Sequence, residues 1–184
     1  MEDRSLVGAG ACARAGSAIL TQRPAGPAAA AWEFSVKVDL HMHSTASDGA
    51  LAPAELMRFC KEAQGLEAVA LTDHDTAAGN AEAAAAAQAL GLRFVSGIEI
   101  SAMWAGQCLH IVGLGIDAAC PALAGISGQL LAFRDRRTTL VGDRLAELGW
   151  PGMEQAAREL APSKDNVSRT HFAMALVAAG ACKD

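Results

Sequence analysis

Two histidines separated by one residue mark the part of the sequence that could do chemistry. The segment Asp39-Leu40-His41-Met42-His43 ends a stretch of alternating apolar and polar residues that begins at Val36, a pattern typical of a β-strand. Successive side chains of a strand point to opposite faces, so His41 and His43 project the same way. Two imidazoles on one face can bind one divalent ion, and Asp48 in the following loop can add a carboxylate. A pair of solvent-exposed histidines is the alternative interpretation.

Three further segments carry residues of the same chemical types near expected strand ends. They are Thr72-Asp73-His74-Asp75, Gly97-Ile98-Glu99 and Leu109-His110-Ile111. In a parallel sheet the carboxyl ends of the strands gather at one edge, where α/β proteins build their sites. The chain has five histidines, and all but one fall at these positions, which a random scatter of structural histidines would rarely produce. We therefore expect a metal centre at this edge of the sheet.

The remaining histidine belongs to a basic segment at the expected start of a helix, Arg169-Thr170-His171-Phe172. A helix N-terminus favours an anion, and an arginine adds a planar pair of donors for phosphate. Arg134 and Arg137, which are three residues apart on a long predicted helix, share one face of it. Both segments predict phosphate contacts, and an ordinary helix start and a solvated charged face are the alternatives.

The apolar pattern predicts the elements that position these residues. We expect strands over 36–40, 66–71, 93–96, 98–103 and 108–115, and helices over 53–64 and 76–90. The β-α-β-α-β order of residues 36–116 predicts a largely parallel sheet. From about Asp117 the pattern is helical, so residues 117–184 are predicted to form a helical lobe. Residues 1–35, rich in Ala, Gly, Pro and Arg, are predicted to be a disordered leader, with a targeting peptide as the alternative.

Composition and charge exclude several classes of function. The formal net charge is -5 and aromatic residues make up 4% of the chain, which argues against binding of extended duplex nucleic acid and against a platform that stacks many bases. No apolar run reaches the ~20 residues of a membrane span. The first residues make a poor signal peptide. The cysteines number five, with no Cys-x-x-Cys pair, and together these features lead us to expect a cytoplasmic protein without a membrane partner.

These motifs resemble the polymerase-and-histidinol-phosphatase (PHP) domain family. The resemblance rests on the segments Asp39–Ser44, Thr72–Asp75, Gly97–Glu99 and His110–Gly113. Through the Arg169–Ala173 segment and the helical lobe it extends to a bacterial subgroup that hydrolyses nucleoside 3',5'-bisphosphates and trims short RNA from the 5' end. It implies an α/β fold that is the N-terminal part of a distorted (β/α)7 barrel with a helical insertion lobe.

The resemblance also implies a role for each matching residue. Up to three divalent ions, often Mn2+ with Zn2+, Fe2+ or Mg2+ as alternatives, would be bound by His41, His43, Asp48, His74, Glu99 and His110, with Glu99 bridging two ions. Phosphate or substrate contacts would come from Arg134, Arg137, Arg169 and His171. The implied reaction is hydrolysis of a phosphorylated nucleotide or short oligonucleotide by a metal-activated hydroxide. Asp73 is a candidate for orienting groups around the metal cluster.

The sequence departs from the family pattern on its C-terminal side. Three further ligands of the family, a histidine in an Ala-His-Pro-like segment and an Asp-x-His pair, do not occur before Asp184. We therefore expect this chain to be the N-terminal portion of a longer enzyme, with the C-terminal half of the barrel absent. The alternatives are a histidinol-phosphatase-like enzyme, a polymerase-associated PHP module, and a non-catalytic fragment that binds metal or nucleotide.

Overall fold

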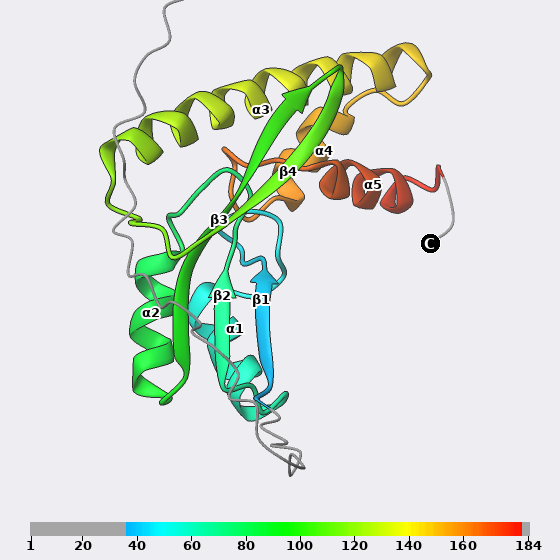
Figure 1. Ribbon diagram of the computed structural model, residues 1–184. Helices are drawn as coiled ribbons and strands as arrows, with labels where there is room; N and C mark the ends of the chain where they lie inside the picture. Colours follow the sequence, from blue (N-terminus) through cyan, green and yellow to red (C-terminus); the bar gives the residue numbers. More distant parts are fainter. Residues whose placement is uncertain (1–35, 182–184) are drawn as a thin grey trace, which may run out of the picture.

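The computed structural model describes residues 36–181, and its four strands form one curled sheet that resembles half of a barrel (Figure 1). In sheet order these are β1 (Val38–Met42), β2 (Ala68–Leu71), β3 (Arg93–Trp104) and β4 (Gln107–Leu114). β1, β2 and β3 pair in parallel, whereas β3 and β4 form an antiparallel hairpin. The α/β class expected from the sequence is therefore confirmed. The predicted leader, residues 1–35, lies outside the described residues.

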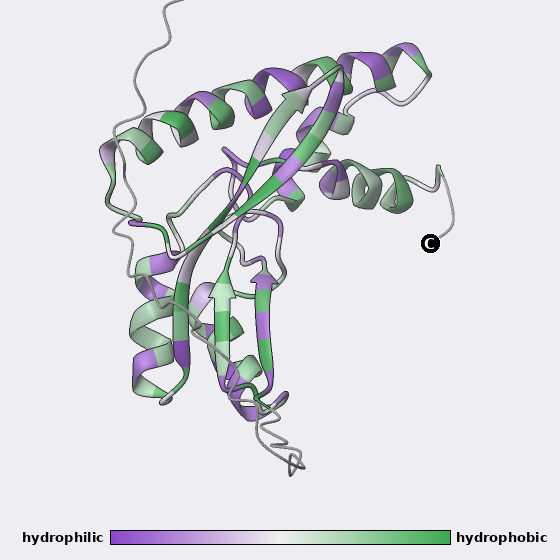
Figure 2. Ribbon diagram, in the orientation of Figure 1, coloured by the Kyte–Doolittle hydropathy of each residue, from purple (hydrophilic) through white to green (hydrophobic). Residues whose placement is uncertain are grey.

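Two helices connect the parallel strands and pack against each other on one face of the sheet. α1 (Pro53–Glu62) starts at the proline expected to open it. α2 (Asn80–Ala89) starts later than predicted, because the hydroxyl of Thr76 accepts a hydrogen bond from the backbone N–H of Ala78 in a turn before the helix. The core between the helices and the sheet consists of Met42, Met57, Cys60, Val69, Leu71, Ala83, Ala87 and Leu92. Figure 2 shows β2 hydrophobic along its length, as expected of a strand buried on both faces.

The strand β3 corrects one prediction. Two short strands were expected around Gly97, but the structure has a single strand of 12 residues. Its first part pairs with β2, and from Gly97 onward it pairs with β4. Gly97 does not interrupt the strand. It lets the backbone of β3 lie close to that of β2, where a Cβ at position 97 would be 2.7 Å from the carbonyl oxygen of Leu71. Glu99 and His110 therefore lie in the middle of β3 and β4 and not at strand ends.

The rest of the described chain is helical and gathers around the outer end of the hairpin (Figure 1). α3 (Pro121–Glu147) is followed by α4 (Met153–Leu160) and α5 (Arg169–Ala178). A small core of Ala157, Ala161, Val167 and Phe172 holds these helices together. Within residues 36–181, no helix is both long and apolar enough to cross a bilayer.

Candidate metal centre

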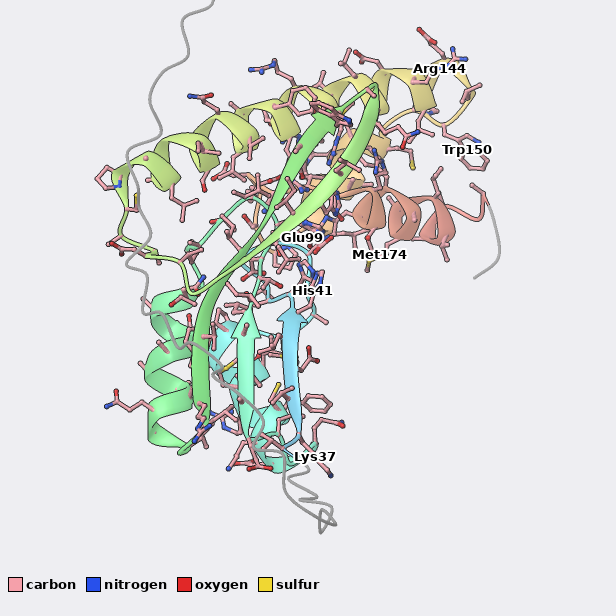
Figure 3. All side chains as sticks on the ribbon, viewed as in Figure 1. Lys37, His41, Glu99, Arg144, Trp150 and Met174 are labelled. Atoms are coloured by element: carbon pink, nitrogen blue, oxygen red, sulfur yellow. The ribbon has the colours of Figure 1, made fainter. Side chains whose placement is uncertain are left out.

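A single carboxylate lies at the middle of the candidate site. Glu99 of β3 is buried, and its Oε2 lies 3.1 Å from Nε2 of His41 and 3.2 Å from Nε2 of His43. The same oxygen lies 3.2 Å from Nδ1 of His74, and the other carboxylate oxygen lies 3.1 Å from Nδ1 of His110. Figure 3 shows Glu99 above His41, close to the end of β1. Four imidazoles from separate parts of the chain thus converge on one acidic side chain.

Asp48 supplies a second carboxylate on the far side of two of these rings. Its oxygens lie 3.7 Å from Nδ1 of His43 and 3.9 Å from Nε2 of His74. Three overlapping groups result, each with ligand atoms within 4.8 Å of one another: His41, His43 and Glu99; His43, Asp48 and His74; His74, Glu99 and His110. The structure therefore brings together all six residues to which the sequence pointed.

The donor set fits a divalent cation. Among the residues that the structure describes, the buried Nδ1 atoms of His43 and His74 have no hydrogen-bond partner. Nδ1 of His43 lies 3.7 Å from an Asp48 oxygen and Nδ1 of His74 lies 3.2 Å from a Glu99 oxygen, in neither case with a hydrogen bond. A cation bound between each nitrogen and oxygen would satisfy both atoms. Burial lowers the pKa of His74 from 6.5 to about 4. The ring is then neutral at pH 7, which is the form that coordinates a metal.

A backbone bridge at the end of β2 sets His74 beside Glu99. The N–H of Glu99 donates to the carbonyl of Asp73 at 3.1 Å, and the N–H of Asp75 donates to the carbonyl of Glu99 at 2.8 Å. Parallel pairing therefore continues past the last residue of β2. The bridge fixes the backbone positions from which the two ligand-type side chains project.

Asp73 organises the loop that carries Asp48. Its buried carboxylate accepts from the backbone N–H of Ser44 at 2.7 Å, from the hydroxyl of Ser44 at 2.7 Å and from the hydroxyl of Ser47 at 2.6 Å. Burial raises the pKa of Asp73, and these serine donors oppose the rise. The loop also packs closely at Gly49, where a Cβ would lie 2.1 Å from the carbonyl oxygen of His43. Asp73 thus holds Ser44 and Ser47 of the loop that carries Asp48.

Asp75 forms a buried ion pair with Arg134, and this contact was missed in the sequence. The Asp75 carboxylate accepts from Nε of Arg134, from the N–H of Ser101 at 2.6 Å and from the hydroxyl of Ser101 at 2.9 Å. Nη2 of Arg134 also donates to that hydroxyl at 3.1 Å. Arg134 therefore ties α3 to the segment that carries His74 through Nε and to β3 through Nη2.

A second missed residue, Asn166, lies in the loop between α4 and α5. Its Nδ2 donates to the backbone carbonyl of His74 at 2.5 Å. The side chain is buried, and its Oδ1 has no hydrogen-bond partner within the described residues. Since amides are common and the two residues are 92 positions apart, no local signal could have identified this contact.

Basic groups border the metal centre on the side of the helical lobe. A pocket of about 180 Å³ is lined by Asp48, His74, His110, Arg134, Arg137, Ser168, Arg169 and Thr170. The hydroxyl of Ser168 caps α5 by accepting from the N–H of Thr170 at 3.1 Å. Burial, together with the nearby charges of Arg134 and Arg169, lowers the pKa of Arg137. An anion in this pocket would relieve the repulsion among these cations.

His171 lies at the start of α5, as expected, and makes a capping contact that the sequence did not predict. Its Nδ1 accepts a hydrogen bond of 3.0 Å from the backbone N–H of Ser168 and so completes the N-terminal cap of α5. The ring is buried, and burial lowers its pKa. In the described part of the chain, His171 is absent from the wall of the small pocket. The structure therefore gives this ring a capping contact, while Arg137 and Arg169 line the pocket.

Comparisons with known proteins agree with this geometry. Residues 39–161 match the family model of the PHP domain. A 5'-3' exoribonuclease from Haemophilus influenzae is 43% identical over 144 residues, which cover 78% of this chain and 52% of that protein. A 3',5'-nucleoside bisphosphate phosphatase from Chromobacterium violaceum is 45% identical over 148 residues, covering 80% of this chain and 51% of that protein.

A solved structure is similar to the same part of the chain. It is an amidohydrolase from Chromobacterium violaceum with bound SO4 and no metal, with a TM-score of 0.77 and 44% sequence identity. The similarity covers 80% of this chain and 52% of that one. The chain spans about half the length of the curated relatives it matches.

Proposed function

The chain belongs to the PHP domain family, and we propose that it acts as a metal-dependent phosphoesterase on nucleoside 3',5'-bisphosphates or on the 5' end of short RNA. The observation that carries this proposal is the convergence of four histidines on Glu99, with Asp48 beside them. Relatives named as a bisphosphate phosphatase and an exoribonuclease support the substrate class.

Six residues would bind the ions. These are His41, His43, Asp48, His74, Glu99 and His110, with Glu99 shared between two of the groups described above. Imidazole and carboxylate ligands together suit Mn2+, Fe2+ and Zn2+, and we expect Mn2+. Divalent ions bound there would neutralise phosphate charge and lower the pKa of a water molecule, so that no protein nucleophile is needed.

The chain's own cations would bind and orient the phosphate. Arg137 and Arg169 line the small pocket together with the first residues of α5, whose backbone N–H groups favour an anion. A guanidinium can donate two parallel hydrogen bonds to phosphate oxygens. Arg134, which is held by Asp75, would contribute mainly its charge, and His171 would support the site through the cap of α5.

At the level of the fold, we propose that the curled sheet is the first part of a distorted (β/α)7 barrel and that residues 117–184 are an insertion lobe. The relatives are about twice as long as the matched segment. In this proposal the remaining three ligands of the family come from a C-terminal segment beyond these 184 residues. The six residues described here would then form the larger part of the metal centre.

The direct test, in the presence of Mn2+, measures phosphate release from adenosine 3',5'-bisphosphate and from histidinol phosphate, and release of nucleoside 5'-monophosphates from a short 5'-phosphorylated RNA. We expect turnover of the bisphosphate or the RNA, and its loss in His41→Ala. Preferential turnover of histidinol phosphate would instead support the histidinol-phosphatase-like alternative. Tight metal binding without turnover of any of the three would support a non-catalytic binding fragment.

A further inference from the structure

A larger cleft near the metal centre is lined by residues of the β3–β4 hairpin and of α3. Figure 1 shows the course of these two elements. Its volume is about 540 Å³, which falls within the range of small-molecule binding sites. Met103 and Cys108 line it from the hairpin, and Leu130 and Phe133 line it from α3. None of these four residues belongs to the metal centre.

The cleft adjoins the basic pocket over the metal centre through shared lining residues. Both are lined by Arg134 and Arg137. In the hairpin register Ser101 faces His110, and two residues further out Met103 faces Cys108. Two residues of a strand span about 6.6 Å, so the cleft opens one row of side chains beyond the metal centre. A phosphate at the metal centre would therefore place the group attached to it inside the cleft.

The walls of the cleft suit a flat heteroaromatic ring. Met103 and Phe133 are apolar yet 64% and 52% exposed, and clustered exposed apolar side chains commonly mark a binding groove. An aromatic ring and a thioether are both favourable neighbours for the face of a nucleobase. Gln129 and Arg136 also line the cleft. Both side chains can donate hydrogen bonds to the edge of a base, and the amide oxygen of Gln129 can also accept one.

We propose that this cleft binds the nucleobase of the substrate, which stacks against Phe133 and Met103 while its phosphate lies at the metal centre. The inference rests on the proposed function and names the part of the substrate that distinguishes a nucleotide from other phosphate esters. It assigns the hairpin and α3 to substrate selection and the sheet edge to phosphate chemistry. An ester without a base would lose the contacts in the cleft and keep those to the phosphate.

The test compares the binding of adenosine 5'-phosphate and ribose 5-phosphate to the full chain in the presence of Mn2+, by isothermal titration calorimetry. Stacking of one base on an aromatic side chain contributes enough to change an affinity by about five- to 100-fold. We expect adenosine 5'-phosphate to bind tighter than ribose 5-phosphate by a factor in this range. Phe133→Ala should remove most of that difference and leave the affinity for ribose 5-phosphate unchanged.

Two further variants make the test specific to the cleft. Ala132→Trp adds a bulky side chain at a residue that lines the cleft and removes no packed group. It should weaken the binding of adenosine 5'-phosphate and leave the binding of ribose 5-phosphate unchanged. Leu140→Ala changes an exposed residue of the same helix outside the cleft, and it should affect neither ligand. Equal affinities of the two ligands in the unmodified chain, or an equal loss of both in Phe133→Ala, would overturn the cleft assignment alone. Failure of both ligands to bind would overturn the proposed function with it.

Discussion

At the scale of single residues, Glu99 is the group on which the proposed metal centre depends. Its carboxylate oxygens lie 3.1–3.2 Å from four imidazole nitrogens. Glu99→Gln keeps the shape of the side chain but removes the charge that binds a cation. We expect the affinity for Mn2+ to fall by at least about 10-fold, measured by calorimetry and by the metal content of the purified protein.

The matched control for this substitution is Glu62→Gln. Glu62 is an exposed carboxylate at the end of α1, so the same chemical change there should leave metal binding as it was. An unchanged metal content in Glu99→Gln would contradict the assignment of the site.

His74 should make the stability of the metal-free protein depend on pH. Burial lowers its pKa from 6.5 to about 4 in the folded chain, so between these values the unfolded chain binds more protons at this position. The contribution of His74 is complete above pH 6.5 and is lost as the pH falls toward 4. Urea unfolding in EDTA should show a decrease of up to about 3 kcal/mol in the free energy of unfolding over this window.

The variant His74→Gln isolates this effect, because it cannot titrate in this range. Titratable groups that do not interact with His74 contribute equally in both proteins, so their contributions cancel in the comparison. The variant should lose less stability than the unmodified chain between pH 6.5 and pH 4. Parallel profiles for the two proteins would show that His74 titrates normally.

The residues of the proposed metal centre could be found from the sequence, whereas those that support it could not. Histidine is scarce in this chain, and strand alternation already places His41 and His43 on one face. Asp75 and Arg134 lie 59 positions apart, and His74 and Asn166 lie 92 apart. Their contacts depend on how α3 and the loop before α5 fold back on the sheet, which no local pattern encodes.

At the scale of the elements, Gly97 shows why strand boundaries were predicted less well than strand identities. A glycine within an apolar run is ambiguous in the sequence, since it marks either a break or a close backbone approach. Here β3 must pass the end of β2 and continue into the hairpin. A Cβ at Gly97 would meet the carbonyl oxygen of Leu71 and the methyl group of Thr72, each at 2.7 Å.

Gly97→Ala should therefore lower the free energy of unfolding by about 1–3 kcal/mol, because the backbone and Thr72 must shift to accept the methyl group. The control is Gly128→Ala in the interior of α3, where a Cβ would meet no described atom within 4 Å. That substitution should raise the free energy of unfolding by about 0.5–1 kcal/mol through helix propensity. Chemical denaturation measures both, and a neutral or stabilising Gly97→Ala would contradict the crowding argument.

The buried ion pair between Asp75 and Arg134 links α3 to the segment that follows β2. Asp75→Asn would leave the buried guanidinium of Arg134 without its counter-charge, so we expect a loss of about 3–5 kcal/mol in the free energy of unfolding. The double variant Asp75→Asn/Arg134→Met should recover part of this loss, because the unpaired buried charge is gone.

The exposed pair of Arg144 and Glu147 provides the comparison for this prediction. Its side chains are 69% and 65% exposed, so Glu147→Gln should cost less than about 1 kcal/mol in the free energy of unfolding. A similar cost for Asp75→Asn and Glu147→Gln would show that the buried pair contributes no more than a surface one.

At the scale of the whole molecule, β1 and β4 are the two edge strands of the described sheet, and β1 is the one that the proposed barrel would close. It lies at one end of the sheet order, and within residues 36–181 only β2 pairs with it. Val38 and Leu40 on this strand are 50% and 39% exposed. An open edge with apolar side chains is a template for pairing with another strand. In the proposed barrel, the strand that pairs with β1 would correspond to a strand in the half of the relatives that this chain does not match.

The open edge predicts how the 184-residue chain behaves in solution. Leu40→Lys places a charge on the edge strand, which is how natural sheets prevent edge-to-edge pairing. We expect this variant to remain monomeric at concentrations at which the unmodified chain associates, as measured by light scattering coupled to gel filtration. Leu140→Lys makes the same change on the exposed face of α3 and should have a smaller effect. If Leu140→Lys suppresses association as strongly, general surface hydrophobicity and not the edge of β1 causes it. In a protein that also contains the barrel-closing strand, the charge at position 40 would lie inside the sheet, and Leu40→Lys should there be destabilising.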